Sequence, residues 1–311
     1  MLLAFATVYV VWGSTYLAIR VALETLPPFS MAAARLLTAG TLLFVWLRWR
    51  GAPAPTRTHC WHAAVSGVLL LTGGNGLVVL AEQAVPSGLT ALLVSLVPIW
   101  FALISALLPR SESPERKTIV GIAAGFGGML LLVTGNPSAS HTSPFPVWAV
   151  LALLVAGISW ASGSLYSKHH ASNESPWMTA ALQMFFGGAA LLIAAVGTGE
   201  WQNFNWNTLS LRSSLALGYL VVFGSWLGYG AYVWLLKECK PAHVATYAYV
   251  NPVVALFLGH FLLGEALNGR VLLAAAIILA GVIIITLPKE VLARATPRGF
   301  VPEGGVARRP E

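Results

Sequence analysis

One arginine lies deep inside an apolar segment, and it is the charged group best placed to bind a ligand. Arg35 follows Met31-Ala-Ala-Ala, about a turn and a half into the apolar run 30–49. An arginine at the centre of a membrane costs roughly 2.5–3.5 kcal/mol, so its presence needs a reason. A snorkelling side chain, or an ion pair with Glu82 or Glu24, would be structural. The alternatives are a gate formed with Glu82, or an anchor for an anionic group on a bound molecule.

Glycine-rich stretches occupy corresponding places in two apolar runs. Thr72-Gly-Gly-Asn-Gly lies in the middle of the run 62–83, and Gly224-Ser-Trp-Leu-Gly-Tyr-Gly230 lies in the run 213–236. Each glycine weakens a helix by roughly 1 kcal/mol relative to alanine, but it lets a ligand or another backbone approach closely. The stretches therefore serve either tight packing or a binding site. We interpret them as flanking a site, with Asn75 among its polar groups.

Two prolines interrupt apolar runs of the two halves. Pro98 lies in the run 89–108 and Pro252 in the run 244–263. Each proline lacks an N–H and frees a carbonyl one turn earlier, so we expect a helix kink that either shapes the helix or lines a polar cavity. Nearby polar side chains that would share such a cavity are Ser95, Tyr249 and Asn251.

The tryptophans divide by their depth in the apolar runs. Those near the ends of runs suit an interfacial belt and receive no binding role: Trp46, Trp49, Trp61, Trp148 and Trp177. Deeper ones would wall an apolar pocket that takes a small amphipathic molecule, unless they face lipid. We assign to this pocket Trp12, Trp100 and Trp160, with the hydroxyls of Tyr16 and Ser164.

The composition is that of a polytopic α-helical membrane protein. The chain of 311 residues is 57% apolar and only 9% charged, with a mean hydropathy of +0.75, whereas soluble domains carry about 25% charged residues. Ten runs approach the length that a helix needs to cross a bilayer. They are 3–22, 30–49, 62–83, 89–108, 118–134, 147–168, 177–197, 213–236, 244–263 and 270–287.

The ten runs form two repeats of five. Residues 9–44 align without a gap to residues 157–192, which places Trp12 on Trp160, Gly40 on Gly188 and Arg35 on Gln183. Because five is odd, the second repeat must enter the membrane inverted, as in secondary transporters. We therefore expect a first repeat at 1–140, a second at 146–288 and an unstructured tail at 289–311.

The basic residues predict the orientation. With the N-terminus in the cytoplasm, 14 of the 18 lysines and arginines fall on cytoplasmic loops or the tail. The positive-inside rule therefore places both termini in the cytoplasm. The basic residues are scattered over loops rather than gathered in one patch, so nucleic acid is not an expected partner.

Motifs for enzymatic chemistry are missing from the sequence. It contains no GxxxxGK[ST], HExxH or GxSxG motif, and Cys60 and Cys239 have no metal-site spacing. We therefore expect no catalysis, no cofactor and no metal. Gly121-Ile-Ala-Ala-Gly125 would suit either a homodimer or packing within one chain.

Several motifs resemble the EamA family of the drug/metabolite transporter superfamily. They are Trp12-Gly-Ser-Thr-Tyr-Leu-Ala-Ile-Arg20 with Pro27-Pro28-Phe29, Pro98 with Glu112, and Pro252 with Leu262-Leu263-Gly264-Glu265. Their order along two repeats is specific, and the opening motif is most similar to the bacterial YedA-like exporters. The resemblance implies a ten-helix inner-membrane carrier. Its cavity would be built from spans 1, 3, 4, 6, 8 and 9, with spans 5 and 10 behind.

We therefore expect an exporter of small amphipathic metabolites, such as amino acids, or of drugs, that works by alternating access. Because no carboxylate lies deep within a span, a facilitator is favoured over tight proton coupling, and Glu82 would be the first proton carrier to test. Uptake or exchange of metabolites is the alternative within the superfamily. A membrane-embedded enzyme or a scaffold is the alternative from another class.

Overall fold

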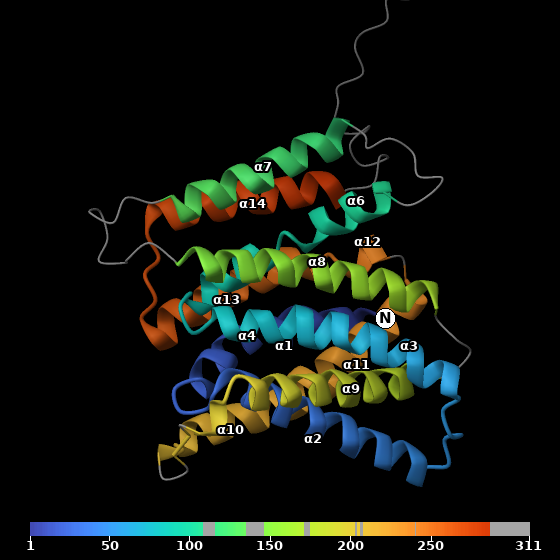
Figure 1. Cartoon of the computed structure of the whole chain (residues 1–311). Coiled ribbons are helices and arrows are strands. Elements are labelled where there is room, and N and C mark those ends of the chain that lie inside the picture. Colours follow the sequence, from blue (N-terminus) through green and yellow to red (C-terminus); the bar gives the residue numbers. More distant parts are fainter. Residues whose placement is uncertain are drawn as a thin grey trace, which may run out of the picture.

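The computed structural model describes residues 1–107, 116–134, 146–170, 175–202, 204–205, 208–239 and 241–286. Glu112 and the predicted tail at 289–311 lie outside these residues. Helices account for all the regular structure in the described part of the chain, and they run roughly parallel to one another (Figure 1). The prediction of an all-α membrane protein with ten spanning helices is confirmed.

Six of the ten spans are single helices. They are α1 (Leu2–Ala22), α2 (Pro28–Trp49), α7 (Arg116–Val133), α8 (Val147–His169), α9 (Pro176–Gly197) and α14 (Gly269–Thr286). Proline begins α2 and α9, where the missing N–H costs nothing because the first turn has no partner for it. These two helices therefore begin at corresponding residues, Pro28 and Pro176.

The third and eighth spans each contain a π-helical segment in the middle. Span 3 consists of α3 (Arg57–Gly67), η1 (Val68–Gly76) and α4 (Leu77–Ala81), and span 8 of α10 (Leu211–Tyr219), η5 (Leu220–Tyr229) and α11 (Gly230–Glu238). The two π-helical segments coincide with the two glycine-rich stretches. Because π-helical turns in proteins frequently mark functional sites, their matching positions support a site between the repeats.

The fourth and ninth spans are broken near their prolines. Span 4 consists of α5 (Ser87–Val94) and α6 (Val97–Leu107), so the break lies just before Pro98. Span 9 consists of α12 (Pro241–Val244) and α13 (Tyr247–Leu263), and α13 continues through Pro252. Gly264, at φ +66°, ends α13 in the left-handed conformation that only glycine adopts without strain.

By length and composition, eight of the spans are long and apolar enough to cross a membrane, and Tyr247–Leu263 and Gly269–Ile285 are shorter apolar helices. Many large apolar side chains face outward, among them Leu3, Trp49, Trp61, Ile193 and Phe261. An apolar surface of this extent suits lipid rather than water. The short helix η3 (Glu200–Gln202) follows the end of span 7.

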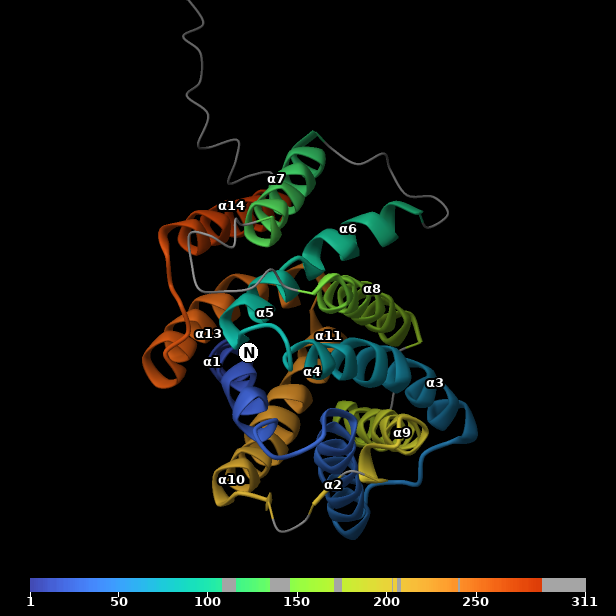
Figure 2. The ribbon, with the colours of Figure 1, turned by 60° about the vertical axis from the view of Figure 1, so that its left-hand side comes forward.

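Equivalent spans of the two repeats pack against each other. α2 packs on α9 where glycines allow close approach: a Cβ added to Gly40 would lie 2.7 Å from the Phe185 nitrogen, and one added to Gly188 would lie 2.9 Å from the Leu37 nitrogen. In the same way α7 packs on α14 through Gly121 and Gly281. Gly121 therefore serves packing within the chain. The α7–α14 pair lies at one edge of the bundle, and α2 lies at the opposite edge (Figure 2).

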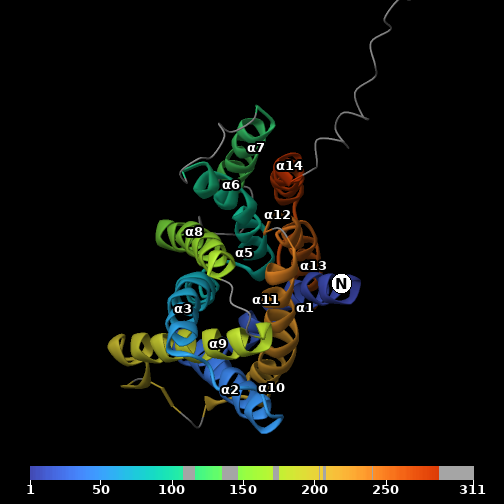
Figure 3. The same ribbon diagram turned by 90° about the vertical axis from the view of Figure 1, so that its right-hand side faces the viewer.

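Between these edges, the first span of each repeat packs on the π-containing span of the other. α1 contacts α10, η5 and α11, while α8 contacts α3, η1 and α4. Figure 3 shows the bundle from another side, with the N-terminus marked at the start of α1. The centre of the molecule is thus built from spans 1, 3, 6 and 8, where the repeats meet.

Candidate substrate cavity

A cavity of about 70 Å³ lies where the repeats meet. Its lining comes from spans 1, 2, 3, 4, 6 and 8 and includes Trp12, Tyr16, Arg35, Asn75, Trp160 and Tyr229. The central cavity therefore contains five residues that the sequence analysis singled out.

Two tryptophans at equivalent positions form one wall of the central cavity. The rings of Trp12 and Trp160 lie 5.5 Å apart at 80°, an edge-to-face arrangement. Each ring packs against a glycine of a π-helical segment: a Cβ added to Gly228 would lie 2.4 Å from the Trp12 Nε1, and one added to Gly74 would lie 2.8 Å from the Trp160 Cε3. The glycine-rich stretches thus make room for the aromatic wall.

Hydrogen bonds fix this wall to the π-helical segments. The Trp12 Nε1 donates to the Gly224 carbonyl at 3.1 Å. The Ser159 hydroxyl, one residue before Trp160, donates to the Leu69 carbonyl at 2.7 Å. Both bonds join the first span of one repeat to the π-containing span of the other, so they hold the repeats in register at the cavity.

Arg35 is the one charged residue among the described residues that line the central cavity. Its side chain is 5% exposed, and its Nε donates to the Ser225 hydroxyl at 2.9 Å. Its Nη1 has no hydrogen-bond partner in the described part of the chain, and neither has the Asn75 Oδ1. The cavity therefore offers a cationic donor and a neutral acceptor between aromatic walls, which is complementary to a small molecule with an anionic group and a donor group.

Sequence comparison gives the family of this chain. Residues 1–134 and 147–287 match the EamA-like transporter family. The chain is 38% identical over 287 residues to the inner membrane transporter YedA of Escherichia coli (strain K12), with 92% of this chain and 90% of YedA covered. The chain belongs to the EamA-like transporter family. It is a multi-pass protein of the inner membrane and a transporter rather than an enzyme.

Other similar proteins match most of this chain, and a solved structure shares its fold. The chain is 27% identical to protein PecM of Dickeya dadantii (strain 3937), with 88% of each chain covered. It is 26% identical to the WAT1-related protein At3g02690, chloroplastic, of Arabidopsis thaliana, with 89% of this chain and 67% of that one covered. A crystal structure with 21% identity superposes with a TM-score of 0.66 over 94% of this chain and 97% of that one, which shows a shared fold.

Other predicted site residues of this EamA-like chain lie outside the lining of the central cavity. Ser95 donates to the Leu92 carbonyl at the break in span 4, and Trp100 packs on Gly157 and Phe126. Ser164 lies behind Trp160, where its hydroxyl is 2.6 Å from the Tyr232 hydroxyl.

Span 9 also lies outside this lining, although the family resemblance implied that it would contribute. Tyr249 donates to the Val282 carbonyl of α14 at 3.3 Å. The Asn251 amide, turned so that its nitrogen donates, lies 2.9 Å from the Tyr9 carbonyl. Span 9 instead supports the aromatic wall from behind, because the Tyr247 ring of α13 lies 5.4 Å from that of Trp12 and Val254 packs against Gly13 of α1.

Arg35 forms neither of the ion pairs that the sequence suggested. Glu24 instead pairs with Arg212, Oε1 to Nη1, at 3.3 Å on the surface. Glu82 is fully buried at the end of α4, and neither of its carboxylate oxygens has a hydrogen-bond partner among the described residues. Arg20 donates to the backbone carbonyl of Glu82 rather than to its carboxylate.

A buried glutamine connects four spans beside the cavity, and its role was missed from the sequence. The Gln183 Nε2 donates to the hydroxyls of Ser66 at 2.7 Å and Ser167 at 3.1 Å. Its Oε1 accepts from the Tyr229 hydroxyl at 2.8 Å. Gln183 occupies the position equivalent to Arg35, and this equivalence was the signal that could have drawn attention to it.

The equivalent basic residues Arg20 and Lys168 make equivalent bonds at opposite ends of the bundle. Arg20 joins the end of α1 to the Glu82 carbonyl, and the Lys168 Nζ joins the end of α8 to the Lys237 carbonyl at 2.7 Å. The Arg20 bond joins span 1 to span 3 of the first repeat. The Lys168 bond joins span 6 to span 8 of the second repeat. We refer below to the Glu82 end and the Lys168 end of the bundle.

Proposed function

We propose that this chain is a secondary carrier that exports a small amphipathic solute, such as an amino acid or a related metabolite or drug, by alternating access. The observation that carries the proposal is the central cavity, where the Trp12–Trp160 wall stands beside two unpartnered polar atoms of Arg35 and Asn75. An apolar body would pack on the indoles, while its polar groups would satisfy the arginine and the asparagine.

Alternating access is supported by the equivalent bonds at the two ends. A carrier of this kind must open one end while the other stays closed, and inverted repeats build the two ends alike. Arg20 and Lys168 make equivalent bonds at the two ends, each within one repeat. We assign them to the outer and the cytoplasmic end respectively, with both termini in the cytoplasm, because the positive-inside rule favours that orientation.

Transport is proposed to run down the gradient of the solute. No carboxylate is found among the described residues that line the central cavity, so a proton cannot compete directly with the solute for an acidic group there. A buried carboxyl outside the cavity, Glu82, is the group to test for coupling.

Flux from proteoliposomes tests the proposal. Vesicles loaded with a panel of labelled amino acids and metabolites should release at least one faster when they contain this protein. Trp160→Ala should abolish that flux because it removes the wall of the cavity. Trp148→Ala, at a half-exposed position on α8 outside the cavity lining, is the matched control and should keep it. Wild-type flux in folded Trp160→Ala protein would refute the site.

A further inference from the structure

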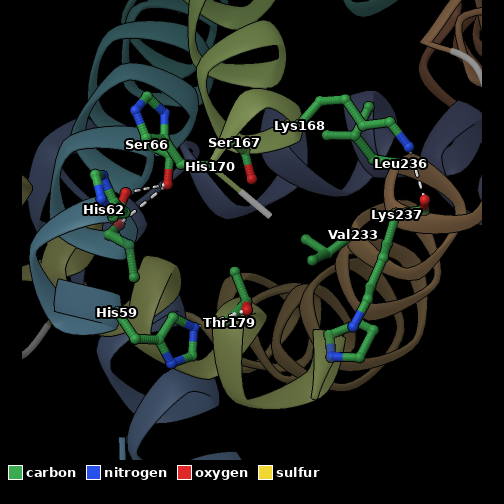
Figure 4. A pocket seen from close by; sticks show the side chains of 12 residues that line it. His59, His62, Ser66, Ser167, Lys168, His170, Thr179, Val233, Leu236 and Lys237 are labelled. Atoms are coloured by element: carbon green, nitrogen blue, oxygen red, sulfur yellow. Dashed lines mark hydrogen bonds between the residues drawn. The ribbon is translucent and has the colours of Figure 1, made fainter. Parts of the chain in front are cut away.

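A second cavity, of about 40 Å³, opens at the Lys168 end of the bundle. It lies between α3, α8, α9 and α11, and Figure 4 shows its side chains around an open centre. We call it the basic vestibule. Five basic residues line it: His59, His62, Lys168, His170 and Lys237.

The described lining of the vestibule is basic. The described lining contains no acidic residue, and the sequence as a whole contains no aspartate. The His62 and His170 rings are stacked with centroids 4.2 Å apart. An anion in this partly enclosed space would interact favourably with the ammonium group of Lys168.

Lys168 is held in place by a bond that leaves donors for a ligand, and Tyr166 orients two histidine rings beside it. Lys168 uses one N–H on the Lys237 carbonyl, and its ammonium has three. The His62 Nδ1 lies 2.8 Å from the Tyr166 hydroxyl, and the His170 Nδ1 donates to the Tyr166 carbonyl at 3.0 Å. The rings are therefore oriented by α8 before any ligand arrives, which reduces the entropy lost on binding.

A single hydrogen-bonded network separates the vestibule from the central cavity. Ser66 and Ser167 line the vestibule, Tyr229 lines the central cavity, and Gln183 binds all three. Beyond Tyr229, the nearest charged group in the cavity lining is Arg35, whose Nη1 has no partner. Positive charge therefore stands on both sides of the Gln183 network.

The opposite end of the bundle has a different charge. A cavity at the Glu82 end is lined by Arg20, Glu24, Pro86, Leu263 and Glu265, and Glu24 also pairs with Arg212, so two carboxylates there accompany two arginines. An anion would be attracted at the Lys168 end and held less strongly at the Glu82 end. This asymmetry favours loading of an anionic solute from the Lys168 end, which the proposed orientation places in the cytoplasm.

We propose that the transported solute carries an anionic group, a carboxylate or a phosphate, and that the basic vestibule is its first binding site. The anionic group is received by Lys168 with His62 and His170, passes the Gln183 network and is then bound by Arg35. This inference rests on the proposed carrier function and adds the class of solute to it. Its test measures binding without a membrane, so that it can fail separately from transport.

The test compares 3-phenylpropionate with 3-phenylpropionamide, which share an apolar body and differ in charge. Titration calorimetry on the full-length protein in neutral detergent should give at least about tenfold tighter binding of the carboxylate. Lys168→Gln, which keeps a donor for the Lys237 carbonyl, should remove most of that preference. So should the pair His62→Gln with His170→Gln.

The matched control is His169→Gln, because His169 is exposed beside His170 and does not line the vestibule. It should bind both probes as the wild type does. Thermal unfolding and gel filtration establish that each variant is folded. Equal binding of the two probes, no measurable binding of the carboxylate, or an unchanged preference in the folded vestibule variants would overturn the proposal.

The anionic group could also come from a lipid headgroup. Changing the lipid composition of the bilayer distinguishes the two sources. Titrations are repeated in nanodiscs of phosphatidylcholine alone and of phosphatidylcholine with phosphatidylglycerol. Equal affinity in both supports a solute site. Loss of carboxylate binding with phosphatidylglycerol would assign the vestibule to a headgroup instead. Carboxylate binding together with absent flux would refute the carrier function but would still support an anion-binding site in the vestibule.

Discussion

At the scale of single residues, the glutamates differ in whether their carboxylates accept hydrogen bonds. Two glutamates have clear structural partners: Glu200 accepts from the Phe29 and Ser30 nitrogens, and Glu265 accepts from the Ser87 and Gly88 nitrogens. Glu82 is different, because its buried carboxylate accepts no hydrogen bond from the described residues. Burying an ionised group without a partner is costly, so such a group favours its neutral, protonated form.

A prediction at this scale concerns Glu82→Gln. The amide has the shape of the protonated acid and cannot ionise, so we expect this variant to fold and to keep flux down the solute gradient. Any stimulation of flux by a pH gradient should vanish in it. Proteoliposome flux with and without an imposed pH gradient measures both effects. Stimulation that persists in Glu82→Gln would exclude Glu82 as a proton carrier.

At the scale of elements, the π-helical segments and the capped helix ends give the spans their shape. η1 and η5 widen at glycines so that Trp160 and Trp12 can lie against them. Glu265 caps the N-terminus of α5 from the loop after α13, where its charge also interacts favourably with the helix dipole. The broken spans thus depend on contacts between the repeats.

Alanine substitutions at two glycines, one closely packed and one open, distinguish the effect of close packing from that of helix propensity. Gly228→Ala should lower flux and thermal stability, because the new Cβ would lie 2.4 Å from the Trp12 Nε1 and displace the wall of the cavity. Gly218→Ala in α10 meets no atom within 4 Å, so it should be neutral or stabilise by up to about 1 kcal/mol. Flux assays and thermal unfolding in detergent measure the contrast. Equal behaviour of the two variants would show that close packing at Gly228 is unimportant.

Removal of the cap on α5 should destabilise the fold without touching the cavity. We expect Glu265→Ala to cost about 1–2 kcal/mol, seen as a lower midpoint of thermal unfolding, because two N–H groups of α5 lose their acceptor. Glu238→Ala, at an exposed position ending α11, is the control. An unchanged midpoint in Glu265→Ala would mean that water replaces the carboxylate at no cost.

At the scale of the whole molecule, the two repeats form one carrier with unlike ends. Equivalent spans pack together as α2 with α9 and α7 with α14, which gives the bundle an approximate two-fold relation. Charge breaks this relation, because the Lys168 end carries the basic vestibule while the Glu82 end carries two carboxylates. An anionic solute would therefore meet different charges at the two ends of the bundle.

The orientation of the bundle is a prediction at this scale. Green fluorescent protein fused after residue 311 should fluoresce in cells, and alkaline phosphatase fused there should be inactive, since both outcomes require a cytoplasmic C-terminus. Active phosphatase at this position would reverse the assignment of the vestibule to the cytoplasmic side. Flux in vesicles with a known insertion direction provides an independent measurement.

The sequence by itself determined the membrane class and the ten spans, because these follow from the length and composition of each apolar run. It also indicated the inverted repeat, because residues 9–44 align without a gap to residues 157–192 and each half contains an odd number of spans. It also indicated Trp12, Asn75 and Trp160. Only the tertiary structure decided which neighbours face the cavity. Successive helical residues point about 100° apart, so Val94 lines the cavity and Ser95 does not.

Contacts between distant spans could not be predicted from the sequence for the same reason. Ser225 rather than Glu82 or Glu24 bonds Arg35, and Gln183 gathers hydroxyls from three other spans. The basic vestibule exists because α3 and α8 bring His62 and His170 together. Such contacts depend on the rotation and packing of every helix, which no single apolar run encodes.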